Sequence, residues 1–186
     1  MSSLVDDREI ARLYEPCLVV SDSQRGCNAV RDAVQQQLAP RNFIEHMLAA
    51  ELIDAEWETL RTRRFKTMIL TSARLPALKS LLTMLLQNAN SADIDELSER
   101  FFTNKSVRSK VGKLLFSYGL TEANIDAEAF RQSLEELGQI NRRLAELASR
   151  RDKILYLFEE HRAGLAVPRP PEATEASRDD FFQEEE

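Results

Sequence analysis

The groups in this chain that could bind a metal ion are two histidines and the glutamates beside them: His46, His161, Glu45, Glu159 and Glu160. Helical bundles hold metal ions with carboxylates and imidazoles on facing helices, often through a Glu-x-x-His spacing. Here Phe43 and Phe158 occupy the positions three residues before the histidines, so both segments lack that spacing. We therefore expect two histidines near a helix end and no metal site, with His46, His161 and Glu159 kept as weak metal candidates.

Basic side chains offer a second chemistry, because clustered cations bind nucleic-acid phosphates. They gather in residues 61–66 and 105–113, and the candidate phosphate contacts are Arg61, Arg64, Lys105, Arg108, Lys110 and Lys113. In the second stretch the apolar residues share one helix face, which leaves the cations pointing outward or sideways. With residues 93–102 this stretch forms a helix–turn–helix-like pair, a pattern that any two amphipathic helices produce. A solvated charged face that binds nothing is the favoured interpretation of this stretch, and phosphate binding is the alternative.

The net charge of −6 argues against a dedicated nucleic-acid binder, since such proteins are usually basic. The basic stretches are offset by an acidic end, because acids dominate the last fifteen residues. The sequence holds five glycines and shows no nucleophile-elbow, P-loop or dinucleotide-binding pattern. We expect no cofactor and predict that the protein is not an enzyme.

Two long segments are amphipathic and free of proline: residues 41–71 and 130–162. Steps of three and four residues separate the apolar side chains of the second segment: Phe130, Leu137, Ile140, Leu144, Leu147, Ile154 and Phe158. The first segment has a matching stripe: Ile53, Trp57, Leu60, Arg64 and Met68. A long helix with one apolar stripe is only marginally stable alone in water. We therefore expect the two helices to pack antiparallel within one chain.

That antiparallel register predicts where individual side chains meet. Trp57 should lie near Arg150 and Arg151, and Arg64 should lie near residues 142–143. Trp57 and Arg151 are also the candidates for an interaction surface, because a tryptophan stands among charges and an arginine interrupts the apolar stripe. The favoured interpretation places Trp57 in the core with an arginine stacked on its ring. The alternative makes it part of a recognition surface.

Shorter helices are predicted at residues 75–87, 93–102 and 105–118, and another ends near Leu38. Pro76 should stop the first long helix, because proline breaks helix interiors. Asn104 can cap one helix, Gly119 can end it, and residues 122–126 should form a turn. The fold class is therefore all-α: a long antiparallel helical hairpin with shorter packing helices. Residues 1–20 form an N-terminal arm, with either a short helix over residues 5–14 or a loose segment. Residues 21–166 form one helical domain, and 167–186 a disordered acidic tail.

The two cysteines are expected to be reduced thiols, with a Cys17–Cys27 disulfide as the less favoured alternative. The first ten residues are polar and acidic, which does not fit a signal peptide. No uninterrupted apolar run approaches the roughly 20 residues of a membrane span. We therefore predict a cytoplasmic protein with no membrane contact.

Three pieces of the chain resemble a group of uncharacterised alphaproteobacterial all-helical proteins of unassigned function. They are residues 39–70 (APRNFIEHMLAAELIDAEWETLRTRRFKTMIL), 118–130 (YGLTEANIDAEAF) and 146–163 (ELASRRDKILYLFEEHRA). The resemblance implies a helical layout and a bacterial source. It transfers no activity and no site residue.

The expected function is a non-enzymatic helical interaction or scaffold protein. It would bind a protein partner, or itself as a homo-oligomer, through the long helix pair. The alternative is a bacterial nucleic-acid-associated accessory protein that uses the basic helices at residues 61–66 and 105–113.

Overall fold

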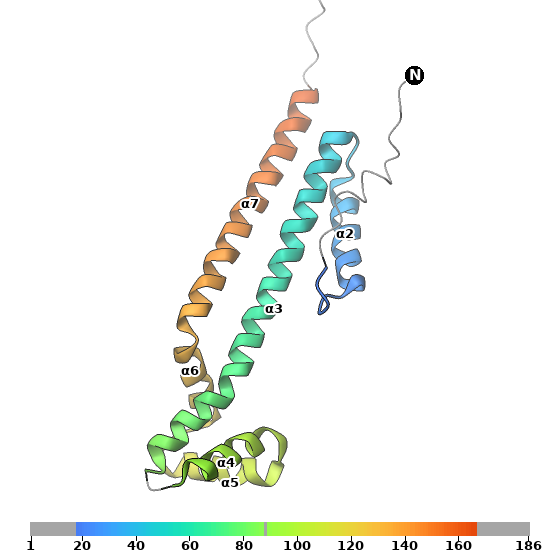
Figure 1. The fold of residues 1–186 in the computed structure, drawn as a ribbon. Helices are drawn as coiled ribbons and strands as arrows, with labels where there is room; N and C mark the ends of the chain where they lie inside the picture. Colours follow the sequence, from blue (N-terminus) through green and yellow to red (C-terminus); the bar gives the residue numbers. More distant parts are fainter. Residues whose placement is uncertain (1–17, 88, 167–186) are drawn as a thin grey trace, which may run out of the picture.

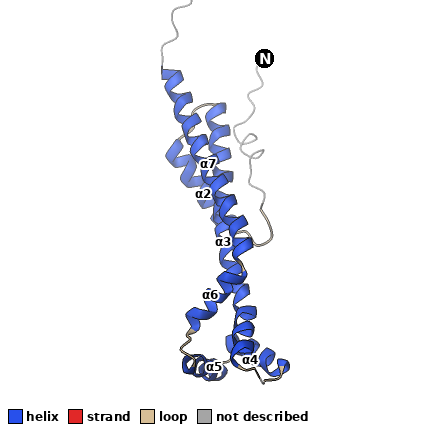
Figure 2. Cartoon of the chain, turned by 90° about the vertical axis from the view of Figure 1, so that its left-hand side faces the viewer, coloured by secondary structure: helices blue, strands red, loops and turns tan. Residues whose placement is uncertain are grey.

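The computed structural model describes residues 18–87 and 89–166, which form an elongated molecule (Figure 1). The helices in that part of the chain are α2 (Gln24–Leu38), α3 (Phe43–Leu85), α4 (Ser91–Thr103), α5 (Lys105–Ser117), α6 (Glu122–Gln132) and α7 (Leu134–Ala166). No strand occurs among the described residues (Figure 2). The predicted all-α class is confirmed. Residues 1–17 of the predicted arm and the predicted tail at 167–186 lie outside the described residues.

The long helices α3 and α7 lie side by side and antiparallel, as predicted (Figures 1 and 2). Arg143 on α7 pairs with Glu58 on α3. Further along, the Lys66 Nζ donates a hydrogen bond to the Asn141 Oδ1 at 3.0 Å. These contacts bring Arg64 level with residues 141–143, which is the predicted register.

The apolar stripe of α7 faces α3 over most of its length. Four of the predicted stripe residues are buried: Leu137, Leu147, Ile154 and Phe158. The first predicted member, Phe130, is half exposed and belongs to α6. The predicted start of the second long helix was therefore wrong, because the helix is interrupted at Ser133.

The predicted turn at residues 122–126 was also wrong, since it forms the first half of α6. Thr121 starts this helix with a capping box, in which the Asn124 side chain accepts from the Thr121 N–H at 2.8 Å. The buried Ser133 ends it, and its N–H is shared between the carbonyls of Ala129 and Phe130. The break lets α6 bury Ile125 and Ala129 in one core while α7 keeps its own stripe against α3.

Pro76 does not end the first long helix, contrary to the prediction. The helix continues as α3 from Phe43 to Leu85 and contains Pro76 in its interior. Pro76 is exposed, so its ring takes no space from the core. The next residues, Ala77 and Leu78, are fully buried. Burial of this face stabilises the helix enough to offset the missing hydrogen bond of proline, a loss of about 3 kcal/mol in an ordinary helix.

The upper end of the molecule is a three-helix layer of α2, α3 and α7. Ser23 begins α2, because its hydroxyl accepts from the Gly26 N–H at 3.1 Å. Asn42 begins α3 in the same way by accepting from the Glu45 N–H. An apolar cluster joins the three helices around Leu52, Ala55 and Ile154.

A charged clamp closes this upper end. Glu45 is 1% exposed, and its Oε2 accepts from the Arg162 Nη2 at 3.0 Å and from the Arg41 N–H at 2.9 Å. The same Nη2 lies 2.6 Å from the Leu38 carbonyl oxygen and 3.1 Å from that of Ala39. The last carbonyls of α2, the start of α3 and the end of α7 therefore meet at one guanidinium.

The lower end, which we call the foot, packs α4, α5 and α6 around the last turns of α3 (Figure 1). Its core contains Leu78, Leu82, Phe101, Leu115 and Ile125, none of them more than 1% exposed. The predicted cap and stop of α5 are confirmed. The Asn104 side chain accepts from the Ser106 and Val107 N–H groups, and Gly119 adopts a φ of 72°.

Between the two ends, α3 and α7 continue without a third described helix on the α2 side of α3. We call this region the waist: residues 60–75 of α3 and the opposing start of α7. The waist separates a small core above from a larger core below, as Figures 1 and 2 show. It therefore contains the part of the hairpin with the least coverage.

Candidate functional site

The waist exposes apolar side chains on α3. Leu60 is 40% exposed, Phe65 is 39% exposed and Met68 is 55% exposed. We call these three residues the waist face. On a helical projection they fall on the side of α3 that α2 covers higher up. Leu60 and Met68 were predicted to pack against α7, and their exposure shows that the predicted stripe turns away from α7 at this level.

The reason is that α3 carries two apolar stripes, one toward α7 and one toward α2. Trp57 belongs to the second stripe and is 2% exposed. Its indole Nε1 donates to the Asp22 Oδ2 at 3.3 Å, just before α2 begins. A Cβ added to Gly26 of α2 would meet the Trp57 ring at 3.5 Å. Trp57 therefore lies in the α2–α3 interface, at the level predicted for it but on another face.

Asp22 is the hub of this interface. Its side chain is fully buried, and its Oδ2 accepts from the Arg61 Nη2 at 2.7 Å and from the Val19 N–H at 3.1 Å. The hydrogen bonds from Arg61 are the main reason that the pKa of Asp22 lies below its ordinary value. Arg64 lies beside the hub, 3.2 Å from the Ser21 carbonyl oxygen and 5.9 Å from the centre of the Trp57 ring.

Two arginines of the first predicted basic stretch, residues 61–66, are bound by Asp22. Arg61 is engaged by Asp22 and is largely covered, and Arg64 is about half covered by the same contacts. A phosphate group would have to compete with a carboxylate already in place. The second basic stretch, on α5, lies in the foot, so the structure does not bring the two predicted phosphate-binding groups together (Figure 1).

The α5 cations differ in how they are held. Arg108 makes a two-pronged pair with Glu122 of α6, at 2.8 and 2.6 Å, which lowers the pKa of Glu122. Three lysines, Lys105, Lys110 and Lys113, are exposed and have no ion pair to a described residue. Phe116 follows them along the outer face of α5 and is 77% exposed. The sequence analysis did not single out this exposed aromatic, which stands beside lysines that have no ion pair to a described residue.

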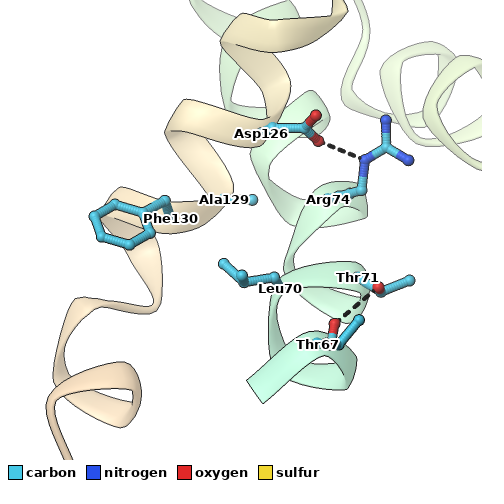
Figure 3. A pocket seen from close by; sticks show the side chains of 7 residues that line it. All are labelled: Thr67, Leu70, Thr71, Arg74, Asp126, Ala129 and Phe130. Carbon is cyan, nitrogen blue, oxygen red and sulfur yellow. Dashed lines mark hydrogen bonds and ion pairs between the residues drawn. The ribbon is translucent and has the colours of Figure 1, made fainter. Parts of the chain in front are cut away.

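A groove opens between α3 and α6, where α6 turns into α7 (Figure 3). Its volume is about 320 Å³, and its walls carry Thr67, Leu70, Thr71, Arg74, Asp126, Ala129 and Phe130. Figure 3 shows Arg74 and Asp126 facing each other across one end, with the Nε 2.7 Å from the carboxylate. The Thr71 hydroxyl donates to the Thr67 carbonyl at 2.8 Å. The arginine is neutralised and this hydroxyl is bonded to backbone, so the groove offers no activated nucleophile.

The predicted metal candidates lie at the upper end near the clamp. His46 and His161 are on α3 and α7 and both are partly buried, whereas Glu159 is exposed. Across the residues that the structure describes, no group of three His, Cys, Asp or Glu side chains is arranged to hold a metal ion. Arg162, adjacent to His161, occupies the position between the helices and binds Glu45.

Arg151, the other candidate interaction residue, is partly buried on the α3 side of α7. Its guanidinium pairs with Asp152 at 2.9 Å and lies 3.9 Å from Glu56 of α3. The hydrogen bond to Asp152 is the main cause of its raised pKa. Both charges of Arg151 and Asp152 are therefore balanced within the hairpin.

No family model, curated protein or solved structure matches the chain. The resemblance to alphaproteobacterial proteins therefore stays a prediction, and the functional argument depends on the surfaces described above.

One helix in the described part of the chain, α3, is long and apolar enough to cross a membrane by length and composition. Only 22% of its most apolar window is buried. Its lower half carries Arg74 and Lys79, and both are paired across helices, with Asp126 and Asp95. Much of the apolar surface of α3 is therefore exposed and available for contact with another molecule.

Proposed function

We propose that this protein is a non-enzymatic helical interaction protein, and that the waist face of α3 binds a helical segment of a protein partner or of a second copy. The observation that carries the proposal is the group of Leu60, Phe65 and Met68, each about 40% exposed or more, below the point where α2 stops covering this side of α3. The described residues offer no arrangement of groups for catalysis beside it. We propose the cytoplasm as the location.

The waist face has the properties of a docking site for a helix. It lies on a straight helical surface, between α2 above and the foot below. Recognition of a helix by a groove uses apolar anchors at helical spacing. Phe65 and Met68 are three residues apart, and Leu60 lies two turns before Met68, so the three side chains share one broad side of α3. Full burial of each large apolar side chain contributes about 1.5–3 kcal/mol. Because each is already half covered, we expect about 1 kcal/mol from each on docking.

Light scattering combined with partner capture tests the proposal. A Met68→Asp variant places a charge in the waist face and should weaken binding about tenfold or more, because a charge is costly to bury. Met84→Asp is the matched control, since Met84 is equally exposed (59%) on the same helix but lies in the foot. Self-association appears as a mass above the 21.3 kDa of one chain. Equal binding by both variants would refute the waist face as the site.

We propose as a second candidate that α5 binds nucleic acid as an accessory surface. The observation that favours it is the exposed face with Lys105, Lys110, Lys113 and Phe116, which combines an aromatic ring with cations that have no ion pair to a described residue. Such a combination suits phosphates and stacked bases. Arg61 and Arg64 contribute little in this version, because Asp22 already binds them.

A gel shift at two salt concentrations tests this candidate. Replacing the three lysines by glutamine should reduce the salt dependence of binding by about one phosphate contact per lysine. Replacing Arg142, an exposed cation of α7, should leave binding unchanged. Affinity that does not change with salt in the wild-type chain would exclude phosphate binding.

A further inference from the structure

The waist face continues the line along α3 on which α2 packs (Figure 1). Trp57 lies against α2, and Leu60, Arg64 and Met68 follow it at steps of three and four residues. This continuity with the α2–α3 interface favours a helix as the occupant below α2. The line from Leu60 to Leu75 measures about 22 Å, which a helix of about 15 residues would cover.

The charge of this stretch indicates which kind of helix fits. Residues 60–75 carry five cations and no acid, and the cations are Arg61, Arg63, Arg64, Lys66 and Arg74. On the opposing start of α7, residues 134–143, two glutamates are matched by two arginines. The whole chain has a net charge of −6. The waist is therefore a cationic segment in an acidic protein.

Two of these cations are neutralised by close carboxylates. Arg74 pairs with Asp126 at 2.7 Å, and Arg61 pairs with Asp22 at the same distance. Asp22 comes from the turn that leads into α2. It is thus an example, within this chain, of a carboxylate that a neighbouring helical segment brings to an arginine of α3.

The other three cations are not neutralised in this way. Arg64 lies within the waist face, its side chain is 40% exposed, and its ion pair with Asp22 spans 3.7 Å. Arg63 is exposed and has no ion pair to a described residue. Lys66 donates to an uncharged partner, the Asn141 side chain. A molecule that covers the waist face therefore meets an excess of positive charge.

A second copy of the chain does not fit this charge. In a symmetric dimer the same patch lies on both sides of the interface, so the cationic stretch of one copy would lie on that of the other. Like charges placed opposite each other destabilise an interface. A helix that carries glutamates or aspartates beside its apolar anchors would instead balance the cations of α3.

We propose that the waist face binds an acidic amphipathic helix of a partner protein rather than a second copy of this chain. This inference rests on the proposed function, because it takes the waist face as the docking site and names the chemistry of the docked helix. The apolar anchors of that helix contact Leu60 and Met68, and its carboxylates lie beside Arg63 and Arg64. Such complementary charges select the partner and raise the rate of association.

Two synthetic helices serve as probes for the full-length chain. Both are stapled peptides of about 15 residues with leucines at the i, i+4, i+7 and i+11 positions. The residues beside the leucines are glutamates in one peptide and lysines in the other. Fluorescence anisotropy of the labelled peptides measures the two dissociation constants. At low salt the acidic peptide should bind about tenfold more tightly or better, and high salt should shrink the difference, because ions screen exposed charges.

Charge reversal tests whether the waist cations make this selection. Arg64→Glu should lower the preference for the acidic peptide to about threefold or less. Arg63→Glu is a second variant with the same expected direction, and it keeps the contacts of Arg64 to the α2 turn intact. Arg142→Glu is the matched control, because it changes the net charge equally at an exposed site of α7. Equal binding of the two peptides, or a preference that both reversals leave unchanged, would overturn the inference.

Truncation of an apolar anchor separates this inference from the proposed function. Met68→Ser should weaken binding of the acidic peptide about fivefold, because the side chain is half covered in the free protein, and Met84→Ser should not. Equal peptide binding by these two variants would refute the waist face as the site, and with it the proposed function. Weaker binding by Met68→Ser without any preference between the peptides would refute the inference alone.

The mass of the wild-type chain tests the choice between a partner and a second copy. Light scattering should give the 21.3 kDa of one chain. A dimer that Met68→Ser dissociates and Met84→Ser does not would overturn the inference, although the waist face would remain the docking site.

Discussion

Replacing Arg162 by alanine should destabilise the upper end by about 3 kcal/mol, a value that follows from its contacts. The Nη2 nitrogen carries two hydrogens and has three acceptors within 3.1 Å, so it makes two good hydrogen bonds at a time. A charged bond to Glu45 contributes about 1.5–3 kcal/mol and a bond to a neutral carbonyl about 1 kcal/mol. The guanidinium also lies 4.4 Å from the centre of the Phe158 ring.

The loss is increased because Glu45 would remain buried without its cation, and decreased because Arg162 is itself one-third exposed. Urea unfolding followed by circular dichroism measures the change. Arg142→Ala is the matched control, because Arg142 is exposed on the same helix and has no ion pair to a described residue. A difference between the two variants below about 0.5 kcal/mol would refute the clamp, since ordinary surface substitutions fall in that range.

The pH dependence of the unfolding free energy provides a second test of the contact between Arg162 and Glu45. The hydrogen bond from Arg162 lowers the pKa of Glu45 below its usual 4.5. A lowered folded-state pKa stabilises the protein above the unfolded pKa, and this stabilisation is lost as the pH falls through the folded pKa. The gap in unfolding free energy between wild type and Arg162→Ala should therefore be full near neutrality and shrink below pH 4.5.

Three other substitutions are expected to have measurable effects. Pro76→Ala should stabilise the protein by about 1–3 kcal/mol in urea unfolding, because alanine restores a hydrogen bond inside a continuous helix. Asp22→Asn should make Trp57 fluorescence more accessible to iodide, because the charge that holds Arg61 is removed. Glu128 should titrate with a pKa of about 2 in carboxyl NMR, because Arg131 donates to it, and Arg131→Ala should raise that pKa. The stability that Glu128 provides is present above about pH 4.5 and lost toward pH 2.

Each of these has a control. Thr83→Ala, an exposed site on α3, should change stability by less than Pro76→Ala, and an equal change would mean that the proline is not strained. Asp32→Asn, exposed on α2, should leave the quenching of Trp57 unchanged. A Glu128 that titrates at its ordinary pKa would show that the pair with Arg131 is not formed in solution.

The sequence was sufficient to predict the hairpin, because helix periodicity and the absence of proline are local properties. The stripe through Leu137, Leu147, Ile154 and Phe158 needed one partner of similar length, and only one other segment offered it. Pro76 could not be judged in this way. A proline ends a helix unless tertiary packing stabilises the residues around it. Here that packing is the burial of Ala77 and Leu78 against α4, α5 and α6, which the sequence of α3 alone does not show.

The candidate site was less predictable, because pairings between distant residues decide it. Arg61 looked available for phosphate, but Asp22, 39 residues earlier, binds it in the folded chain. Met68 was predicted to pack against α7, because the apolar residues of α3 were taken as a single stripe. The sequence does not show that these residues form two stripes, since this depends on where α2 packs against α3. Phe116 follows Leu115 directly and so leaves the i, i+4 spacing of the buried residues Val107, Val111 and Leu115, which places it on the side of α5 that the foot does not cover.

The ion pairs between the two long helices have a uniform direction. In every such pair among the described residues the acid lies on α3 and the arginine on α7, and the acids are Glu45, Glu51, Asp54, Glu56 and Glu58. If hairpins opened at Ser133 and exchanged helices, α7 of one chain would match α3 of another, whereas two α3 helices would repel along this face. The charge arrangement thus selects exchanged dimers with intact pairs over any dimer that joins like helices there.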